Sequence, residues 1–197
     1  YGLVTFILNN KFIRRSWRES GSPDYKQVAS FRLQQSYDFF EASQQTHRQG
    51  PVRPWSEVLG LLDVRFDAFE TNTQVKYFPY HNATNTSSRV LVRNQRGDFA
   101  QLSFTQTYKI TESLDVDFST RTEVYGLGAG LNFRYVTLLG SVHYSPVANG
   151  IQSWTAETRL HPPGKCWGLQ WLFNQLVGDR EINTKFNFEF QFGGTES

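Results

Sequence analysis

The sequence is poor in several residue classes at once. It contains no methionine and one cysteine among 197 residues, and charged residues make up 19% of it, against about 25% in ordinary soluble domains. Hydrophobic residues make up 39%, which is also below the usual range of about 45–50%. No segment approaches the run of about 20 apolar residues that a membrane-spanning helix needs, and the mean hydropathy is −0.49. The composition therefore excludes a helical membrane protein.

Aromatic residues, by contrast, are abundant. The chain has 17 Phe, 9 Tyr and 5 Trp, which together make up 16% of the residues. Disordered chains are depleted in aromatic residues and carry a high net charge, whereas the formal net charge here is only +2. The basic residues are spread along the chain without the block that nucleic-acid-binding proteins show. We therefore expect a folded chain with no nucleic-acid partner, and its length suits a single domain over residues 1–197.

The lone cysteine and the first residues both bear on whether the chain stands alone. Cys166 cannot form a disulfide within the chain, so it is a buried apolar thiol, a free thiol or half of a bridge to a cysteine elsewhere. Tyr1 begins an apolar run without an initiator methionine or the charged and apolar regions of a signal peptide. We expect the chain to be an internal or C-terminal portion of a larger processed protein.

The dominant pattern is alternation with a period of two, which is typical of β-strands. It is clearest near the C-terminus, where Phe186, Phe188, Phe190 and Phe192 alternate with Lys185, Asn187, Glu189 and Gln191. Similar runs occupy residues 29–39, 62–68, 100–110, 114–124, 127–135 and 167–174, and turn signals separate the runs. We expect an all-β antiparallel fold with about a dozen strands of about 9–13 residues, longer than is usual in globular sheets.

Two all-β architectures show this alternation. A soluble sandwich or lipocalin-like barrel places apolar residues inside and polar residues outside. A transmembrane β-barrel reverses this arrangement and needs strands of about 9–11 residues to cross the bilayer. Long strands, a polar face of Asn, Gln, Ser and Thr rather than Lys and Glu, and aromatic residues at strand ends favour the membrane barrel. We therefore expect an antiparallel transmembrane β-barrel of about 12 strands, closed alone or as part of a larger barrel.

The connections are expected to differ between the two rims of such a barrel. Residues 16–26, 42–56 and 81–88 have the composition of long polar loops. Gly97-Asp98 and Glu112-Ser113, by contrast, leave room only for tight turns. This difference predicts long loops at one rim and short turns at the other.

Charged residues on the polar face of two predicted strands are the candidates for a functional surface. Asp115, Asp117, Arg121 and Glu123 alternate along one strand, and Lys185 and Glu189 lie along the last. No catalytic constellation accompanies them, so we interpret them as the hydrated wall of a lumen. A barrel enzyme would need a serine and a histidine on neighbouring strands at one rim, and the sequence nominates no such pair. We expect no catalytic residues and no enzyme activity.

Other residues that often carry chemistry give no site. The histidines lie in separate segments without the spacing of metal ligands. Gly126, Gly128 and Gly130 lack the helix that follows a dinucleotide-binding loop, and glycines within a strand more often mark a bulge or close packing. We expect neither a metal nor a cofactor.

Four features follow one another near the end of the chain. They are an alternating strand at residues 154–160, a turn with Cys166-Trp167-Gly168, the acidic turn Gly178-Asp179, and the aromatic strand at residues 186–192. In this order they resemble the C-terminal end of the LptD family of outer-membrane LPS-assembly proteins, also called organic solvent tolerance proteins. The opening Tyr1-Gly2-Leu3 is similar to a strand start in the middle of that barrel. Elsewhere the resemblance is one of architecture only.

The resemblance implies a place in the outer membrane of a Gram-negative bacterium. Members of the LptD family are large barrels with a periplasmic jellyroll domain, which this chain does not show. They receive lipopolysaccharide from a periplasmic bridge, hold the plug lipoprotein LptE in the lumen, and release lipid A through a seam between the first and last strands. By this resemblance, residues 182–192 would form one side of the seam and would be read by the barrel-assembly machinery.

The resemblance also bears on the lone cysteine. Cys166 matches a position at which the family carries C-terminal cysteines that bridge to cysteines near the periplasmic domain. Trp167 stands where a second cysteine often occurs, so the resemblance implies one interdomain bridge at most. A lone buried thiol remains the alternative.

Two functions follow from these expectations. The first is a non-enzymatic component of a lipopolysaccharide translocon, in contact with the plug lipoprotein, the periplasmic bridge, the assembly machinery and outer-membrane lipid. The second is a self-contained outer-membrane barrel that acts as a pore or, with less support, as an enzyme.

Overall fold

The computed structural model describes residues 2–17, 21–43, 52–110, 116–162, 167–178 and 181–190, with the backbone alone at positions 110 and 116–120. Cys166, Asp115 and Phe192 lie outside the described residues, as does the side chain of Asp117. The predictions for these positions therefore remain predictions.

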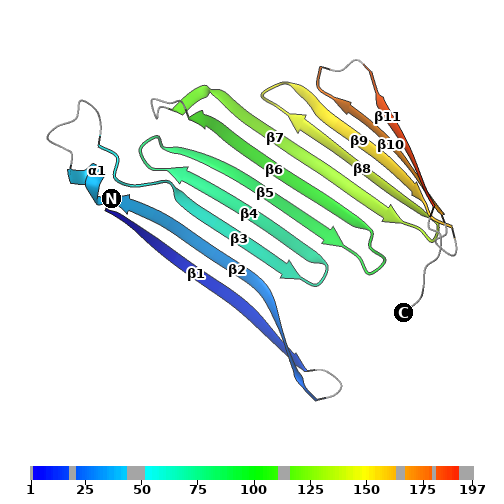
Figure 1. Cartoon of the computed structure of the whole chain (residues 1–197), viewed down its shortest axis with the longest axis horizontal. Coiled ribbons are helices and arrows are strands. Elements are labelled where there is room, and N and C mark those ends of the chain that lie inside the picture. The colour runs from blue at the N-terminus through cyan, green and yellow to red at the C-terminus, as the bar shows by residue number, and fades with distance from the viewer. Residues whose placement is uncertain are drawn as a thin grey trace. The chain divides into compact units, whose positions relative to one another are not determined.

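The described residues form one antiparallel sheet whose 11 strands pair in the order of the sequence (Figure 1). The elements are β1 (Leu3–Trp17), β2 (Pro23–Asp38), α1 (Phe39–Ser43), β3 (Val58–Phe66), β4 (Phe69–Phe78), β5 (Ala83–Arg93), β6 (Phe99–Ile110), β7 (Val116–Asn132), β8 (Val136–Ser145), β9 (Gly150–Leu160), β10 (Trp167–Leu176) and β11 (Asn183–Phe190). The expected all-β antiparallel fold is confirmed. Within the described residues the pairing order ends at β1 and β11. None of the described helices has the length and hydropathy needed to span a membrane.

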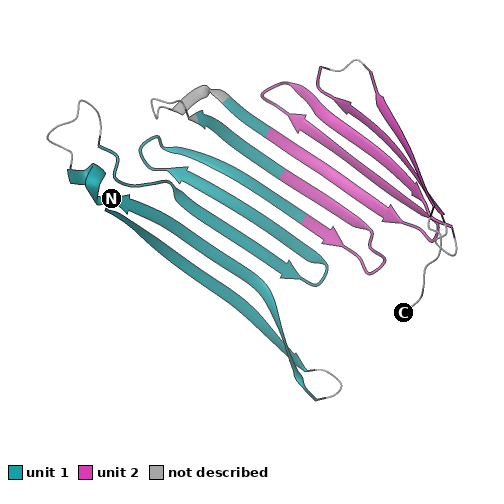
Figure 2. Ribbon diagram, viewed as in Figure 1, with its two compact units in different colours: residues 1–90, 104–123 teal, residues 91–103, 124–197 magenta. Residues whose placement is uncertain are grey.

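The chain divides into two compact units (Figure 2). Unit 1 contains Tyr1–Val90 and Phe104–Glu123, and unit 2 contains Leu91–Ser103 and Val124–Ser197. Strands β5, β6 and β7 each contribute residues to both units.

Unit 1 is built on the long hairpin of β1 and β2. Backbone pairing extends over the whole of β1, from Leu3 to Trp17, with a register shift between Phe12 and Ile13. Strand β3 pairs only with residues 29–34 of β2. The end of the hairpin at which β1 turns into β2 therefore extends past β3.

The two ends of β3 in unit 1 have very different connections. The segment from β2 to β3 contains the helix α1. Asp38 caps the first turn of this helix, because its side chain accepts a hydrogen bond from the backbone N–H of Phe40 at 2.9 Å. Only Asp67 and Ala68 separate β3 from β4, and Asp67 has a φ of 46°, a left-handed conformation that aspartate tolerates in tight turns. The two connections of β3 thus differ strongly in length.

Almost no residue of the sheet is buried in a hydrophobic core. Among the described residues, Ala83 and Leu91 are the only buried hydrophobic side chains, with 2% and 4% of their surface exposed. Large apolar side chains such as Leu127, at 55%, are exposed instead. The accessible surface of the chain is 14641 Å², whereas a folded soluble monomer of 22.8 kDa exposes about 9,600 Å². The apolar sides of the strands therefore have no protein core to pack against.

Three segments differ from the sequence-based expectation. The described parts of two alternating runs, residues 116–124 and 127–132, belong to one continuous strand, β7, where the sequence predicted two. The expected loop at residues 16–26 is mostly strand, because β1 extends to Trp17 and β2 begins at Pro23.

The expected loop at residues 81–88 is also wrong. Strand β5 begins at Ala83, and the hydroxyl oxygens of Thr73 and Ser88 lie 2.9 Å apart across β4 and β5. Cross-strand hydroxyl pairs stabilise a sheet, and threonine favours extended backbone. A polar segment of this composition can therefore form a strand. Glu112-Ser113 lies outside the described residues.

Candidate functional site

One side of unit 2 carries polar side chains across four strands. Residues directly opposite each other in an antiparallel pair share a side of the sheet, and the registers place Gln170 opposite both Arg159 and Asn187. The side chains of this side, which we call the polar face, are Thr137, Ser141, His143, Ser153, Thr155, Glu157, Arg159, Gln170, Asn174, Asn183, Lys185, Asn187 and Glu189, together with Leu139, Leu172 and Leu176. The sequence predicted Lys185 and Glu189 for such a face, and both lie on it.

Hydrogen bonds join the polar face from strand to strand. The hydroxyl oxygens of Ser141 and Thr155 lie 2.7 Å apart between β8 and β9. Between β9 and β10, the Gln170 side-chain amide donates to Glu157 Oε1 at 2.7 Å. The same carboxylate forms an ion pair with Arg159 on its own strand, and the Glu157 side chain is only 14% exposed. The ion pair and the hydrogen bond offset the free-energy cost of burying the charged Glu157 carboxylate.

The polar face is hollowed near the start of β10. A depression of about 500 Å³ is lined by Thr137, Arg159, His161, Gln170, Asn187 and Glu189, among others. A second, of about 510 Å³, includes Lys185 in its lining. Ligand sites are commonly concave and of this size, with a few polar groups that fix the ligand's orientation. Guanidinium, amide and carboxylate groups together can donate and accept hydrogen bonds, which suits a polyhydroxylated or zwitterionic solute.

The aromatic residues of β11 lie on the side opposite the polar face, as the alternation predicted. Phe186, Phe188 and Phe190 are all exposed, and Phe186 is the most exposed of them at 64%. The Phe188 and Phe190 rings contact each other edge to face, with ring centres 4.3 Å apart, and Phe188 stacks against Trp167 of β10 at 5.9 Å. The strand therefore has one aromatic side and one polar side.

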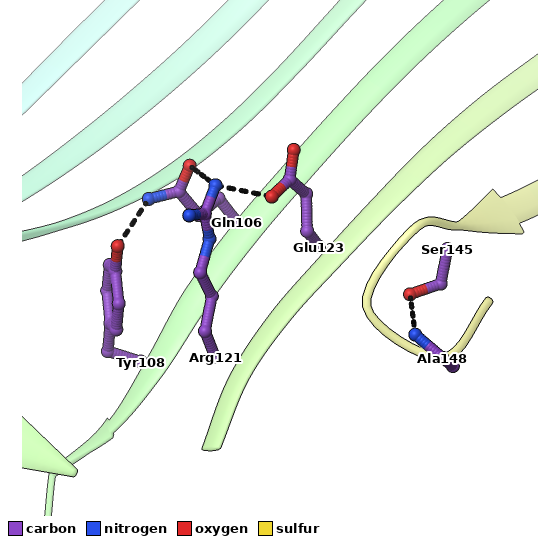
Figure 3. A network of polar contacts seen from close by, with 6 residues as sticks. All are labelled: Gln106, Tyr108, Arg121, Glu123, Ser145 and Ala148. Atoms are coloured by element: carbon purple, nitrogen blue, oxygen red, sulfur yellow. Dashed lines mark hydrogen bonds and ion pairs between the residues drawn. The ribbon is translucent and has the colours of Figure 1, made fainter. Parts of the chain in front are cut away.

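Arg121 and Glu123, two of the four charged residues predicted for β7, belong to a small network in unit 1 (Figure 3). Arg121 forms an ion pair with Glu123, and its Nη2 donates to Gln106 Oε1 at 3.4 Å. Gln106 Nε2 in turn donates to the hydroxyl oxygen of Tyr108 at 3.2 Å. Only 8% of the surface of Glu123 is exposed. The ion pair with Arg121 offsets the cost of burying the Glu123 carboxylate.

This network differs from the sequence-based expectation in one respect. The alternation along residues 100–110 groups Tyr108 with the apolar positions, but its hydroxyl group joins the polar network. Tyrosine combines an apolar ring with a polar tip, so a pattern of apolar and polar letters does not assign its side.

The glycines of β7 allow close packing, as the sequence predicted for them. A Cβ atom on Gly126 would lie 2.2 Å from Ser103 Oγ, and one on Gly130 would lie 2.2 Å from an atom of the Phe99 ring. Neither distance is possible between real atoms, so side chains from β6 occupy the space above these glycines. The glycines therefore belong to side-chain packing and not to a phosphate-binding loop.

The structure also brings together a serine and a histidine that the sequence did not nominate. Ser153 Oγ lies 3.2 Å from His143 Nδ1 between the neighbouring strands β8 and β9. The other side of the imidazole faces the position above Gly126, where a Cβ atom would lie 3.1 Å from His143 Nε2. No signal short of the strand register could have identified this pair, because ten residues separate its members in the sequence.

A hydrogen-bonded clasp in unit 2 joins the turn before β6 to the end of β7. The backbone N–H of Asn132 donates to Asp98 Oδ1 at 2.6 Å, and Asn94 Nδ2 donates to Asp98 Oδ2 at 2.7 Å. Asn132 Nδ2 donates in return to the carbonyl oxygen of Gly97 at 2.8 Å. The Asn132 N–H and then the Asn94 amide hold the pKa of the Asp98 carboxyl below its ordinary value.

The described residues contain no group of three or more histidine, cysteine, aspartate or glutamate side chains placed to hold a metal ion. The site is therefore best defined by its hydrogen-bonding surface. No known family model matches this chain, and no curated protein is significantly similar to it.

Proposed function

We propose that this chain forms part of the wall of an outer-membrane β-barrel. The observation that carries the proposal is the reversed burial of its strands, which expose their apolar side chains and join polar ones across the strands. Exposed apolar surface costs roughly 25 cal/mol per Å² in water, and this cost disappears against acyl chains. Strands β5 and β9, with 11 residues each, match the length of about 9–11 residues that crosses a bilayer.

Closure is part of this proposal. Unpaired backbone groups are costly in hydrocarbon, so every strand of a membrane-embedded sheet needs a partner on each side. Strands β1 and β11 end the described pairing order. They would pair with each other or with further strands of a larger barrel, as the resemblance to the LptD family implies.

Within that barrel, we propose a non-enzymatic role in moving lipopolysaccharide to the outer leaflet. The resemblance of the last strands to the LptD family supports this role, and so does the chemistry of the polar face. Glu157, Arg159 and Gln170 offer donors and acceptors to the sugar part of an amphiphile. The aromatic side of β11 would guide acyl chains into the membrane. The proposed partners are lipopolysaccharide, the plug lipoprotein, the periplasmic bridge and the barrel-assembly machinery.

Site-specific photocrosslinking tests the transport role. A photocrosslinker at Asn187, on the polar face, and one at Phe188, on the aromatic side, should both capture lipopolysaccharide in cells. The same crosslinker at Gln74, on β4 of unit 1, is the control and should capture less. Absence of capture at both β11 positions, combined with ion conductance of the purified chain in planar bilayers, would overturn transport in favour of a simple pore.

A second candidate, an outer-membrane hydrolase, rests on the Ser153–His143 hydrogen bond alone. A nucleophilic serine needs a base within hydrogen-bond reach, and this pair has that geometry. We expect the reconstituted chain to release no fatty acid from phospholipid vesicles. Release that disappears in Ser153→Ala would establish the hydrolase instead.

The interdomain bridge implied for Cys166 is tested on the full-length protein. A non-reducing gel should show different migration for the parent and for Cys166→Ser if the bridge forms. Identical migration would reject the bridge and leave the lone thiol.

A further inference from the structure

The end of the β1–β2 hairpin in unit 1 extends beyond its neighbour in the sheet. Within the described residues, β2 residues 23–27 pair with β1 and not with β3 (Figure 1). Strands β1 and β2 have 15 and 16 residues, more than the roughly 9–11 that cross a bilayer. If unit 1 is embedded as proposed above, this end of the hairpin lies at the membrane surface.

Two basic residues lie where the apolar side of unit 1 ends. That side carries Phe31 of β2 opposite Leu62 of β3, and it continues along β3 to Phe66. The guanidinium carbon of Arg14 lies 5.4 Å from the centre of the Phe66 ring, and Lys26 is paired directly with Arg14 across the hairpin. Both cations therefore border the surface that would face acyl chains.

The charges of Arg14 and Lys26 are only weakly compensated. Like charges directly opposite each other destabilise an antiparallel pair. Arg14 Nη1 lies 3.6 Å from Asp67 Oδ2, but the two side chains are 52% and 67% exposed, so water screens this ion pair. An anion held between Arg14 and Lys26 would offset their mutual repulsion.

The other side of the hairpin adds a third cation and aromatic rings. The guanidinium carbon of Arg15 lies 4.2 Å from the ring centre of Trp17 and 5.8 Å from that of Tyr25. Among the described residues at the hairpin end, Arg14, Arg15 and Lys26 are basic and Asp24 is acidic.

We propose that Arg14 and Lys26 bind the phosphate of an anionic glycerophospholipid whose acyl chains lie beside Phe66. The site lies next to Asp67 and Ala68, the two-residue turn between β3 and β4. Short turns face the periplasm in outer-membrane barrels. The periplasmic leaflet is built of glycerophospholipids, whereas lipopolysaccharide occupies the outer leaflet. This inference rests on the proposed membrane placement and is independent of lipopolysaccharide transport.

A tryptophan placed at the site can report which lipid lies there. The Phe66→Trp chain is inserted into phosphatidylcholine vesicles that contain either brominated phosphatidylglycerol or brominated phosphatidylcholine. Quenching of the added fluorescence, relative to the parent chain, gives the relative affinity for the two lipids. We expect phosphatidylglycerol to be favoured by about fivefold for each basic residue, because one such residue near an anionic surface contributes about 1 kcal/mol.

Substitutions then assign the preference to the two cations. Arg14→Gln combined with Lys26→Gln should abolish it. Arg32→Gln, on the opposite side of β2, is the matched control and should keep it. The exchanged variant, Arg14→Lys with Lys26→Arg, should also keep the preference for phosphatidylglycerol. For every variant, heat-modifiable migration on gels establishes that the chain has inserted.

The possible outcomes separate this inference from the proposed function. Equal quenching by the two lipids, or a preference that survives the double glutamine substitution, would overturn the phospholipid site. Displacement of phosphatidylglycerol by added lipopolysaccharide would overturn it in favour of lipopolysaccharide phosphates. A parent chain that fails to insert would overturn the membrane function as well, whereas insertion without a lipid preference would overturn the phospholipid site alone.

Discussion

Strands β1 and β11 are both exposed at every described position, but they carry apolar residues in different patterns. On β11 the aromatic rings occupy one side, and Lys185, Asn187 and Glu189 occupy the other. On β1 large apolar residues occur on both sides, mixed on one of them with Thr5, Asn9 and Lys11. Leu3, Ile7 and Ile13 lie on one side, and Phe6, Leu8 and Phe12 lie on the other.

The difference concerns what each strand must contact. A strand with one apolar side, such as β11, would fit the lipid–water boundary of the proposed barrel. A strand with large apolar residues on both sides, such as β1, leaves some of them in water unless lipid or protein covers each side. We therefore expect β1 to meet lipid on one side and other protein on the second, whereas the polar side of β11 meets water or a polar ligand.

The largest effect is expected on the aromatic side of β11. Phe186→Lys should reduce the stability of the inserted chain by about 2–4 kcal/mol, the cost of a lysine facing lipid near the bilayer midplane. Asn187→Lys, one position away on the polar face, should change it by no more than about 0.5 kcal/mol. Urea titration of both variants in vesicles measures the difference. Equal costs would show that β11 has no lipid-facing side.

The next effect tests the second apolar side of β1. Ile7→Lys and Leu8→Lys should each destabilise the inserted chain, by about 1–3 kcal/mol, because both side chains are expected to be covered. The same urea titration applies. If only Leu8→Lys destabilises, then β1 has a wet side like that of β11, and the contrast between the two strands disappears.

A smaller effect is expected in the network of β7. Glu123→Gln removes the anionic partner of the Arg121 guanidinium and should cost about 1–2 kcal/mol. The cost is moderate because the Arg121 side chain is 42% exposed and water can replace part of the lost interaction. Glu189→Gln changes an exposed carboxylate on β11 in the same way and should be nearly neutral. Equal costs would mean that burial of Glu123 contributes nothing.

The smallest effect concerns pH and the clasp at Asp98. Hydrogen bonds from Asn132 and Asn94 lower the pKa of this carboxyl in the folded chain from its ordinary 3.8. The resulting stability is therefore present above pH 3.8 and is lost as the pH falls through the lower folded-state value. Asp98→Asn should reduce stability at neutral pH and leave it unchanged in strong acid. A difference that persists in strong acid would assign the effect to hydrogen-bond geometry rather than charge.

The sequence predicted the sides of the strands well because the period of two is a local property. The alternation of Phe186, Lys185 and their neighbours needs only two adjacent residues to be read, and β11 has the predicted sides. The sequence also predicted the turn at Gly97-Asp98. Gly97 there has a positive φ of 86°, which glycine adopts readily.

Contacts between strands could not be predicted in the same way. The hydrogen bond from Gln170 to Glu157 and the pairing of His143 with Ser153 depend on register, which the pattern of one strand does not fix. The loop expected at residues 81–88 failed for a related reason, because the hydroxyl of Ser88 finds its partner on another strand. Local composition predicts which residues share a side of one strand. The pairing of the strands then determines which of those side chains contact one another at the candidate site.

The near absence of buried hydrophobic side chains also determines how such a chain can fold. A soluble domain begins with collapse around its own apolar residues, but this sheet offers Ala83 and Leu91 and little else to collapse around. Before insertion, the same apolar strands would be open to pairing with other copies. If the chain is part of the membrane barrel proposed above, its folding is completed at the membrane rather than in water, and the unfolded chain depends on a chaperone during its passage to that membrane.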